Sequence, residues 1–245
     1  MIPWLPAGGP FPAVEEALEE PNGLLAAGGD LSPSTLLCAY RQGIFPWYDD
    51  SQPILWWSPA PRCVFRPGDL HLSRRTRRTL RGWNPQIRLD QNFAGVIDAC
   101  AAPRAGQDGT WITRDMRDAY LRLHHLGHAH CVTVHDDQGL AGGIYGIQLG
   151  GVFFGESMFS RRDNGSKCAL AALWALAPEL GIQLLDAQVE NPHLMRLGAV
   201  LMPRQEFQTA LRTLITDTEP RKWPPVPMTW NGLTDRDRAA ISFKL

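Results

Sequence analysis

The sequence is short of net charge, of paired cysteines and of long apolar runs, and each shortage excludes a class of protein. Its 24 Lys and Arg against 25 Asp and Glu leave a formal charge of −1, so any nucleic-acid site must be a local patch. Five scattered cysteines without a CxxC pair argue against a disulfide framework and against structural zinc, and fit a reducing cytoplasm. No apolar segment approaches membrane-spanning length, and the N-terminus lacks the basic and apolar regions of a signal peptide. We therefore expect a cytoplasmic protein with no membrane partner.

The chain is long enough for a substantial core. Its 245 residues, 44% of them hydrophobic, suit either one large domain or a large domain with a small one. Residues 1–62 are rich in proline, glycine and tryptophan, and we expect short strands there, a weak helix over 13–19 and a stronger helix over 34–42. Ser32 is placed to cap the stronger helix and Gly43 to end it. This segment is predicted to be a small, irregular N-terminal domain.

The rest of the chain alternates helices with strands. We expect helices over 92–101, between Thr113 and Gly127, over 166–180 and over 204–215, and strands over 128–135, 140–149, 151–155, 182–189 and 199–202. Met116, Tyr120, Leu123 and Leu126 form the apolar stripe of the second helix. Short DDQG and GG turns suit antiparallel hairpins between the first three strands.

This order of elements is that of the N-acetyltransferase superfold. Helix, three antiparallel strands, helix and strand predict an α+β fold with a mixed, largely antiparallel sheet over residues 63–224, followed by a loosely held C-terminal tail over 225–245. In that fold acyl donors bind where two strands separate. A coenzyme A user normally has a glycine-rich turn before the helix, and the MFSRRDNGSK turn lacks that pattern. The order therefore favours acyl transfer from a carrier other than coenzyme A.

Three polar side chains are expected at the ends of apolar strands. One strand runs into Glu156, and the strand after the long helix carries Asp186 and Gln188, two residues apart. Side chains two apart share a strand face, so Asp186 and Gln188 should project together. The alternative is that they bond neighbouring backbone or begin a surface loop. Glu156 repeats the pattern, and because such groups cost free energy unless they are hydrogen-bonded, the repetition favours a site.

Positive charge is concentrated in residues 71–82, HLSRRTRRTLRG. On a helix, the i, i+3 and i+4 spacings place most of its arginines on one broad face: Arg74, Arg75, Arg77, Arg78 and Arg81. A solvated helix face is the ordinary interpretation. No interleaved acidic residue neutralises the run, so phosphate contact is the second interpretation.

Three histidines raise the question of a metal site. His128 and His130 would share one strand face, with His135 further along, but no third ligand lies at a useful spacing. We expect ordinary strand residues here, no metal ion and no cofactor.

Several long motifs carry a family resemblance. They are EPNGLLAAGGDLS, GIFPW, ILWWSP, GTWIT, LGHAH, GGIYG, FFGESMFS and LLDAQ, spread from about residue 20 to residue 205. Together they resemble the leucyl/phenylalanyl-tRNA–protein transferase family. The resemblance implies a bacterial cytoplasmic aminoacyltransferase that moves Leu or Phe, and less readily Met, from aminoacyl-tRNA to the N-terminal Arg or Lys of proteins. The new N-terminus then marks the protein for degradation by the N-end rule. It also implies a small N-terminal domain on an N-acetyltransferase-type domain, no cofactor and no DNA partner.

The resemblance also implies the site residues. By motif, the residues tied to activity fall on Glu156, Asp186 and Gln188. The donor pocket falls on Ile144, Phe153, Gly155, Ser157, Leu170, Leu173 and Leu185, although each of the apolar ones could equally be plain core. Trp47 and Trp111 match tryptophans near the terminal adenosine, where ring stacking is expected. The arginine run matches a basic patch for the tRNA acceptor stem.

The chemistry sets what these residues must supply. An aminoacyl ester is already activated, so aminolysis needs only deprotonation of the amine, oxyanion donors and a proton for the leaving hydroxyl. An amide is a very weak base, so we expect Gln188 to position the amine. Asp186 and Glu156 would attract and orient the cationic N-terminal residue, with the tRNA ribose or water helping proton transfer.

Two other functions fit parts of the sequence. A coenzyme A-dependent N-acetyltransferase fits the order of elements but not the turn before the helix. A non-catalytic RNA-binding module fits the arginines and tryptophans but leaves Glu156, Asp186 and Gln188 unexplained.

Overall fold

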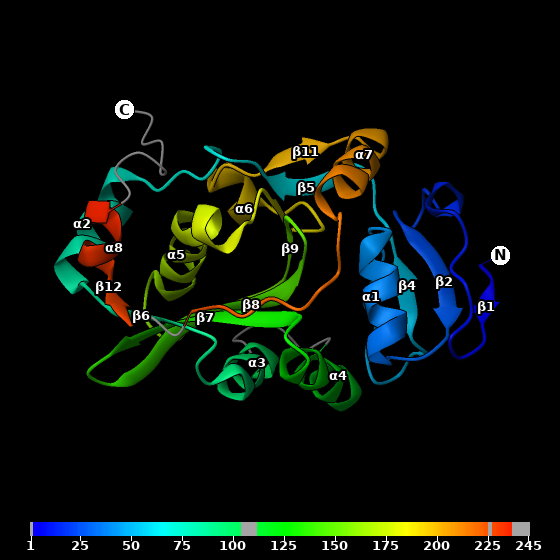
Figure 1. Ribbon diagram of the computed structural model, residues 1–245, viewed down its shortest axis with the longest axis horizontal. Coiled ribbons are helices and arrows are strands. Elements are labelled where there is room, and N and C mark those ends of the chain that lie inside the picture. The colour runs from blue at the N-terminus through cyan, green and yellow to red at the C-terminus, as the bar shows by residue number, and fades with distance from the viewer. Residues whose placement is uncertain (1, 104–111, 225–226, 237–245) are drawn as a thin grey trace.

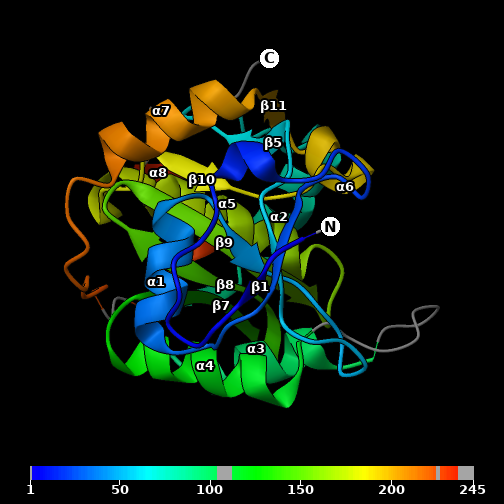
Figure 2. The same cartoon turned by 90° about the vertical axis from the view of Figure 1, so that its right-hand side faces the viewer.

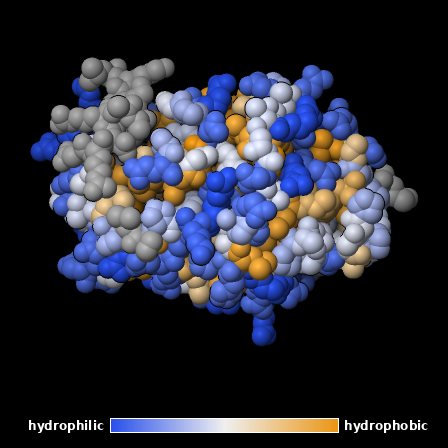
Figure 3. Space-filling model, in the orientation of Figure 1, coloured by the Kyte–Doolittle hydropathy of each residue, from blue (hydrophilic) through white to orange (hydrophobic). Residues whose placement is uncertain are grey.

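A computed structural model describes residues 2–103, 112–224 and 227–236, which form two sheets of unequal size (Figure 1). The smaller sheet has the strand order β1-β2-β4-β3 and the larger one β11-β5-β10-β9-β8-β7-β6-β12. Within the described ranges, no helix is long and apolar enough to cross a membrane. The face in Figure 3 is mainly hydrophilic, with apolar residues in small patches.

The smaller sheet lies at the N-terminal end of the molecule. Its strands are β1 (Trp4–Leu5), β2 (Leu24–Gly28), β3 (Phe45–Pro46) and β4 (Leu55–Trp57). Helix α1 (Pro33–Arg41) begins as predicted, because the Ser32 hydroxyl accepts the Thr35 N–H, and Gly43 follows it with φ +75°. The weak helix expected over 13–19 is wrong, since only a single 3-10 turn, η1 (Val14–Glu16), forms there.

The larger sheet confirms the predicted α+β fold with a mixed, largely antiparallel sheet. Strands β7 (Ala129–Asp136), β8 (Gly139–Leu149) and β9 (Val152–Ser160) are antiparallel hairpins, whereas β10 (Leu184–Asp186) is parallel to β9. The remaining strands are β5 (Arg62–Phe65), β6 (Gln86–Leu89), β11 (Val200–Met202) and β12 (Met228–Thr229). The order of elements is that expected of the N-acetyltransferase type.

Helices cover both faces of this sheet. In Figure 1, α3 (Phe93–Ala101) and α4 (Arg114–His125) lie on one face, and α5 (Gly165–Leu180) lies on the other. Near the edges are α2 (Arg74–Trp83), α6 (Pro192–Arg196) and α7 (Arg204–Leu214). The two faces hold separate apolar clusters, and α5 contributes a run of buried residues, mostly alanines and leucines, to one of them. The predicted stripe of α4 is buried except at Leu126, which follows the helix and is exposed.

Strand β9 does not end before Glu156 as expected, but continues through it. Tyr145 of β8 pairs with Ser157, and the next residue, Gly146, pairs with Gly155, so Glu156 is the extra residue of a β-bulge. A β-carbon at Gly146 would lie only 2.1 Å from a carbonyl oxygen of β9, which explains glycine opposite the bulge. Glu156 keeps the side of the sheet that Val152 and Phe154 take, where it meets Tyr120, and the bulge shifts the register only beyond it.

Strand β10 is shorter than the expected strand over 182–189. It ends at Asp186, and Gln188 has φ +62°, a left-handed conformation that is uncommon outside glycine. Strand β9 continues to Ser160, but its pairing with β10 covers only Val152–Phe154, so the two parallel strands separate beyond that point.

Residues 227–236, which fall within the loose tail expected over 225–245, form a strand and a helix. Strand β12 extends the large sheet beside β6, and α8 (Trp230–Arg236) packs on α2 and α5 with Trp230 buried. Residues 225–226 and 237–245 lie outside the described ranges. The domain boundary between residues 62 and 63 stays a prediction.

Candidate active site

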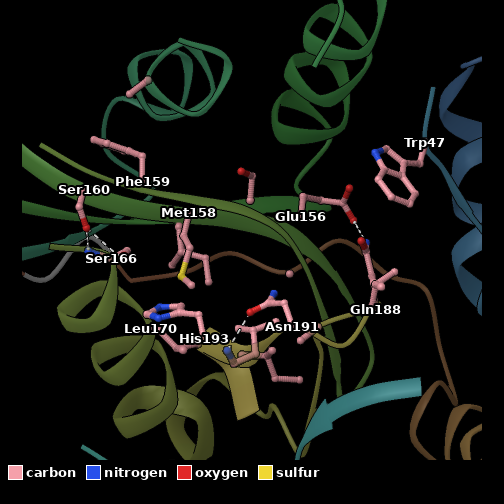
Figure 4. Close-up of a pocket in the computed structure, with 18 of the residues that line it drawn as sticks. Trp47, Glu156, Met158, Phe159, Ser160, Ser166, Leu170, Gln188, Asn191 and His193 are labelled. Carbon is pink, nitrogen blue, oxygen red and sulfur yellow. Dashed lines mark hydrogen bonds between the residues drawn. The ribbon is translucent and has the colours of Figure 1, made fainter. Parts of the chain in front are cut away.

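A pocket of about 890 Å³ opens where β9 and β10 separate, beside the small sheet (Figure 4). Trp47, Glu156 and Gln188 lie at one end of it, and Ser160 and Ser166 at the other. Its apolar wall between these ends includes Phe65, Ile144, Met158, Leu170, Leu185 and Leu194. The pocket therefore joins a mainly apolar chamber to a carboxylate and an amide.

Glu156 is a buried carboxyl that faces this pocket. The Tyr120 hydroxyl donates to its Oε2 atom at 2.6 Å, and the Gln188 side-chain amide donates to Oε1 at 2.8 Å. Burial raises the pKa of Glu156 to about 7, although hydrogen bonds from the tyrosines act in the opposite direction. A carboxyl with this pKa can both accept and release a proton near neutrality.

Gln188 reaches Glu156 because of its unusual backbone. The Gln188 N–H donates to Asp186 Oδ1 at 2.9 Å, and the Gln188 carbonyl accepts the N–H of Cys63 at 3.1 Å. These two bonds hold the left-handed conformation, which would otherwise be strained for a residue with a β-carbon. The side-chain nitrogen is engaged by Glu156, and no group in the described ranges donates to the amide oxygen, so that oxygen can serve a substrate.

Asp186 lies behind the site and does not line the pocket. Arg62 holds it with two bonds, Nε to Oδ1 at 2.8 Å and Nη2 to Oδ2 at 2.7 Å, and both side chains are about 1% exposed or less. The expectation that Asp186 attracts the cationic N-terminal residue stays a prediction; in this structure Arg62 pairs with Asp186, and the carboxylate has no accessible surface. In this structure Asp186 positions the backbone of Gln188 by accepting its N–H.

Arg62 is a residue that the sequence analysis missed. Its guanidinium lies 4.8 Å from the ring centres of both Phe45 and Phe207. These two rings cover the part of the guanidinium that the salt bridge to Asp186 does not occupy. The sequence signal that could have found it is a single arginine in the otherwise apolar strand RCVF, because a buried arginine needs a buried partner.

The other predicted site residues divide into three groups. Those that line the pocket are Trp47, Ile144, Gly155, Ser157, Leu170 and Leu185. Phe153 and Leu173 do not line it, because both are fully buried in the apolar cluster on the α5 face, where Phe153 also contacts Trp223. Trp111 lies outside the described residues. Pocket residues that sequence reasoning missed include Phe65, Met158, Asn191 and His193.

The arginine run forms helix α2 as predicted, with Ser73 as its N-cap. Arg74, Arg75, Arg78 and Arg81 are exposed, and Arg77 is half-buried. In Figure 1, α2 lies at the far end of the molecule from the small sheet. Its contact with nucleic acid stays a prediction.

The histidines take part in packing. His130 bonds Asp90 at 2.7 Å through Nδ1 and stacks on Trp223 at 4.5 Å between ring centres, while His128 is buried beside it and His135 half-buried. Among the described residues, no group of three or more His, Cys, Asp or Glu side chains is arranged to hold a metal ion.

The fold and this site define an acyltransferase-type protein, in which an apolar acyl group can lie beside a carboxylate of near-neutral pKa. Comparison with known proteins agrees. The family model "Leucyl/phenylalanyl-tRNA protein transferase" matches residues 64–212, and the model of that family's N-terminal domain matches residues 29–60. The chain belongs to the leucyl/phenylalanyl-tRNA protein transferase family.

Individual relatives cover nearly the whole chain. A leucyl/phenylalanyl-tRNA–protein transferase of Alcanivorax borkumensis is 55% identical over 235 residues, 95% of this chain and 97% of that one. One from Xylella fastidiosa strain M23 is 58% identical over 225 residues, 91% of this chain and 90% of that one. Among solved structures, a GCN5-related N-acetyltransferase from Kribbella flavida matches with a TM-score of 0.38 and 13% identity, over 70% of this chain and 61% of that one.

Removing Arg62 should destabilise the protein strongly. Arg62→Ala leaves Asp186 as an uncompensated buried charge, so we expect the free energy of unfolding to fall by about 3–5 kcal/mol in urea titrations. The matched control is Arg66→Ala, because Arg66 is half-exposed in its ion pairs with Asp69 and Glu206 and should cost about 1 kcal/mol or less. Equal stability of the two variants would contradict the proposed burial.

The pKa of Glu156 predicts a pH dependence of stability. With a folded pKa of about 7 and an ordinary value of 4.5, the folded protein binds more protons than the unfolded chain between these pH values. Rising pH through this window should therefore lower the free energy of unfolding of the wild type relative to Glu156→Gln, by on the order of 3 kcal/mol. Parallel pH curves from denaturant titrations of the two proteins would refute the raised pKa.

Proposed function

We propose that this protein transfers leucine or phenylalanine, and less readily methionine, from aminoacyl-tRNA to the N-terminal Arg or Lys of other proteins, which marks them for N-end-rule degradation. The observation that carries the proposal is the pair Glu156 and Gln188 at the end of an apolar pocket, in a chain of this family. We place the reaction in the cytoplasm, where charged tRNA and new N-termini occur together. The activated ester supplies the driving force, so no cofactor is required.

The donor is proposed to bind with its side chain in the apolar chamber. Ile144, Leu170 and Leu185 give that chamber hydrocarbon walls, which suit leucine or phenylalanine. Trp47 is 43% exposed and tilted on Trp57, with 5.5 Å between ring centres, so its free face can stack on the terminal adenosine. We propose the same role for Trp111.

The acceptor amine is proposed to bind beside the hydrogen bond that joins Gln188 to Glu156. The free amide oxygen of Gln188 accepts an N–H of the amine and orients its lone pair, while Glu156 takes the proton that the nitrogen loses. An α-amino group has a pKa of about 7.7–8.0, close enough to that of Glu156 for efficient transfer. Glu156 is a far better base than an amide, so it is the candidate proton acceptor, and Gln188 keeps the positioning role expected from the sequence.

The covalent step exchanges one bond for another. The nitrogen attacks the ester carbonyl, the new C–N bond forms, and the bond from that carbon to the 3′-oxygen breaks. The proton held by Glu156 passes through the ribose 2′-hydroxyl or water to the leaving 3′-oxygen, so the enzyme returns to its starting state. Asp186 and Arg62 act from behind, by fixing the backbone that carries Gln188.

A direct transfer assay tests the function. Purified protein, Leu-tRNA and a peptide beginning with Arg should yield a peptide with one added leucine by mass spectrometry, and a peptide beginning with Glu should stay unmodified. Glu156→Gln and Gln188→Ala should each lower kcat, by about 10²–10⁴-fold for the loss of a general base at Glu156. Acetylation of the peptide from acetyl-CoA, without leucine transfer, would favour the N-acetyltransferase alternative instead.

The exposed arginines of α2 are proposed to bind phosphates of the acceptor stem. Arg74→Ala with Arg78→Ala should weaken tRNA binding and reduce the slope of log K against log salt by about 1 for each phosphate that the variant no longer binds. Arg212→Ala removes an equally exposed arginine from α7 and should leave both quantities unchanged. Filter binding at several salt concentrations measures both, and an unchanged slope in the double variant would exclude α2 from the interface.

A further inference from the structure

Two buried phenols connect Glu156 to the N-terminal part of the chain. The Tyr120 hydroxyl of α4 donates to Glu156 at 2.6 Å, and the Tyr40 hydroxyl of α1 lies 2.6 Å from that of Tyr120. Neither tyrosine has accessible surface. Figure 2 shows α1 above α4, and the two helices are in contact, so a residue of the N-terminal part reaches the site from behind.

Proton count limits the direction of these hydrogen bonds. Tyr120 has one hydroxyl proton and gives it to the ionised carboxylate, so Tyr40 donates toward Glu156, either through the Tyr120 oxygen or to the carboxylate itself. Burial and the neighbouring Glu156 raise the pKa of both phenols well above the usual 10, which keeps them protonated as donors. A chain in which each donor points toward the carboxylate stabilises its ionised form.

The other groups around Glu156 do not stabilise its ionised form through a chain of hydroxyl donors. Asp186 on β10 disfavours the ionised form and Arg62 on β5 favours it, but the two are bound to each other. Tyr145 on β8 packs edge-on against Tyr120 with 5.6 Å between ring centres, and its buried hydroxyl has no hydrogen-bond partner among the described residues. Gln188 donates to the second carboxylate oxygen but belongs to the substrate side of the site.

We propose that Tyr40 and Tyr120 are positioning residues that keep Glu156 ionisable in its buried setting, so that helix α1 helps to set the basicity of the catalytic carboxylate. The effect on catalysis rests on the proposed function, whereas the hydrogen-bonded chain itself does not. The consequence is specific: loss of a donor makes the carboxylate harder to ionise, so the base is formed only at higher pH.

Conservative variants test the chain. Tyr120→Phe removes the direct donor, and the acidic limb of the kcat–pH profile should move upward by about one pH unit. Tyr40→Phe removes the second donor and should move the limb in the same direction by less. Infrared titration of the protonated carboxyl, with Glu156→Gln as the subtracted reference, should give the same two shifts without any substrate.

Tyr145→Phe is the matched control, because it removes an equally buried hydroxyl beside the same ring but breaks no hydrogen bond to Glu156. It should retain the wild-type pH profile and infrared titration. Unshifted titrations in Tyr120→Phe and Tyr40→Phe, or equal shifts in Tyr145→Phe, would overturn the proposal. Absence of leucine transfer by the wild type would instead overturn the proposed function, and the infrared titration would still decide on the chain. If Tyr120→Phe does not fold, Tyr40→Phe alone decides.

Discussion

The hydrogen bond from the Gln188 amide to the Glu156 carboxylate joins two strands at the point where they separate. The parallel register pairs Phe154 with Asp186, so Glu156 and Gln188 lie at matching positions two residues beyond the last pair. The left-handed backbone of Gln188, held by its bonds to Asp186 and Cys63, then sets the direction of its side chain. The pocket, the free amide oxygen and the candidate base all follow from this one contact.

The two buried carboxylates, Asp186 and Glu156, lie close together but have different partners. Asp186 is compensated by the fork of Arg62, so it can remain charged and serve as a fixed support. Glu156 has only neutral donors, and burial therefore dominates and raises its pKa to about 7. The salt bridge therefore assigns Asp186 to structure, whereas Glu156 remains available for proton transfer.

Local pattern was sufficient for much of the fold but not for the details of the site. The long helix before Gly181 and the hairpin strands were predictable because apolar periodicity and turn residues are local signals. The bulge at Glu156 was not, since it depends on pairing with β8. Arg62 and Tyr40 are distant in sequence from the residues they hold, and in sequence Tyr120 looked like one more member of an apolar stripe, so only the folded chain assigns them a function.

The central claim is that Glu156 and Gln188 face the ester carbonyl of a donor whose side chain occupies the neighbouring chamber. It is tested most directly by a crystal structure with leucyl-adenosine in which an amide replaces the ester. The account predicts the leucine side chain among Ile144, Leu170 and Leu185, with the carbonyl carbon adjacent to the Gln188 amide and the Glu156 carboxylate. A carbonyl turned away from both groups, or an adenosine bound elsewhere on the surface, would contradict it.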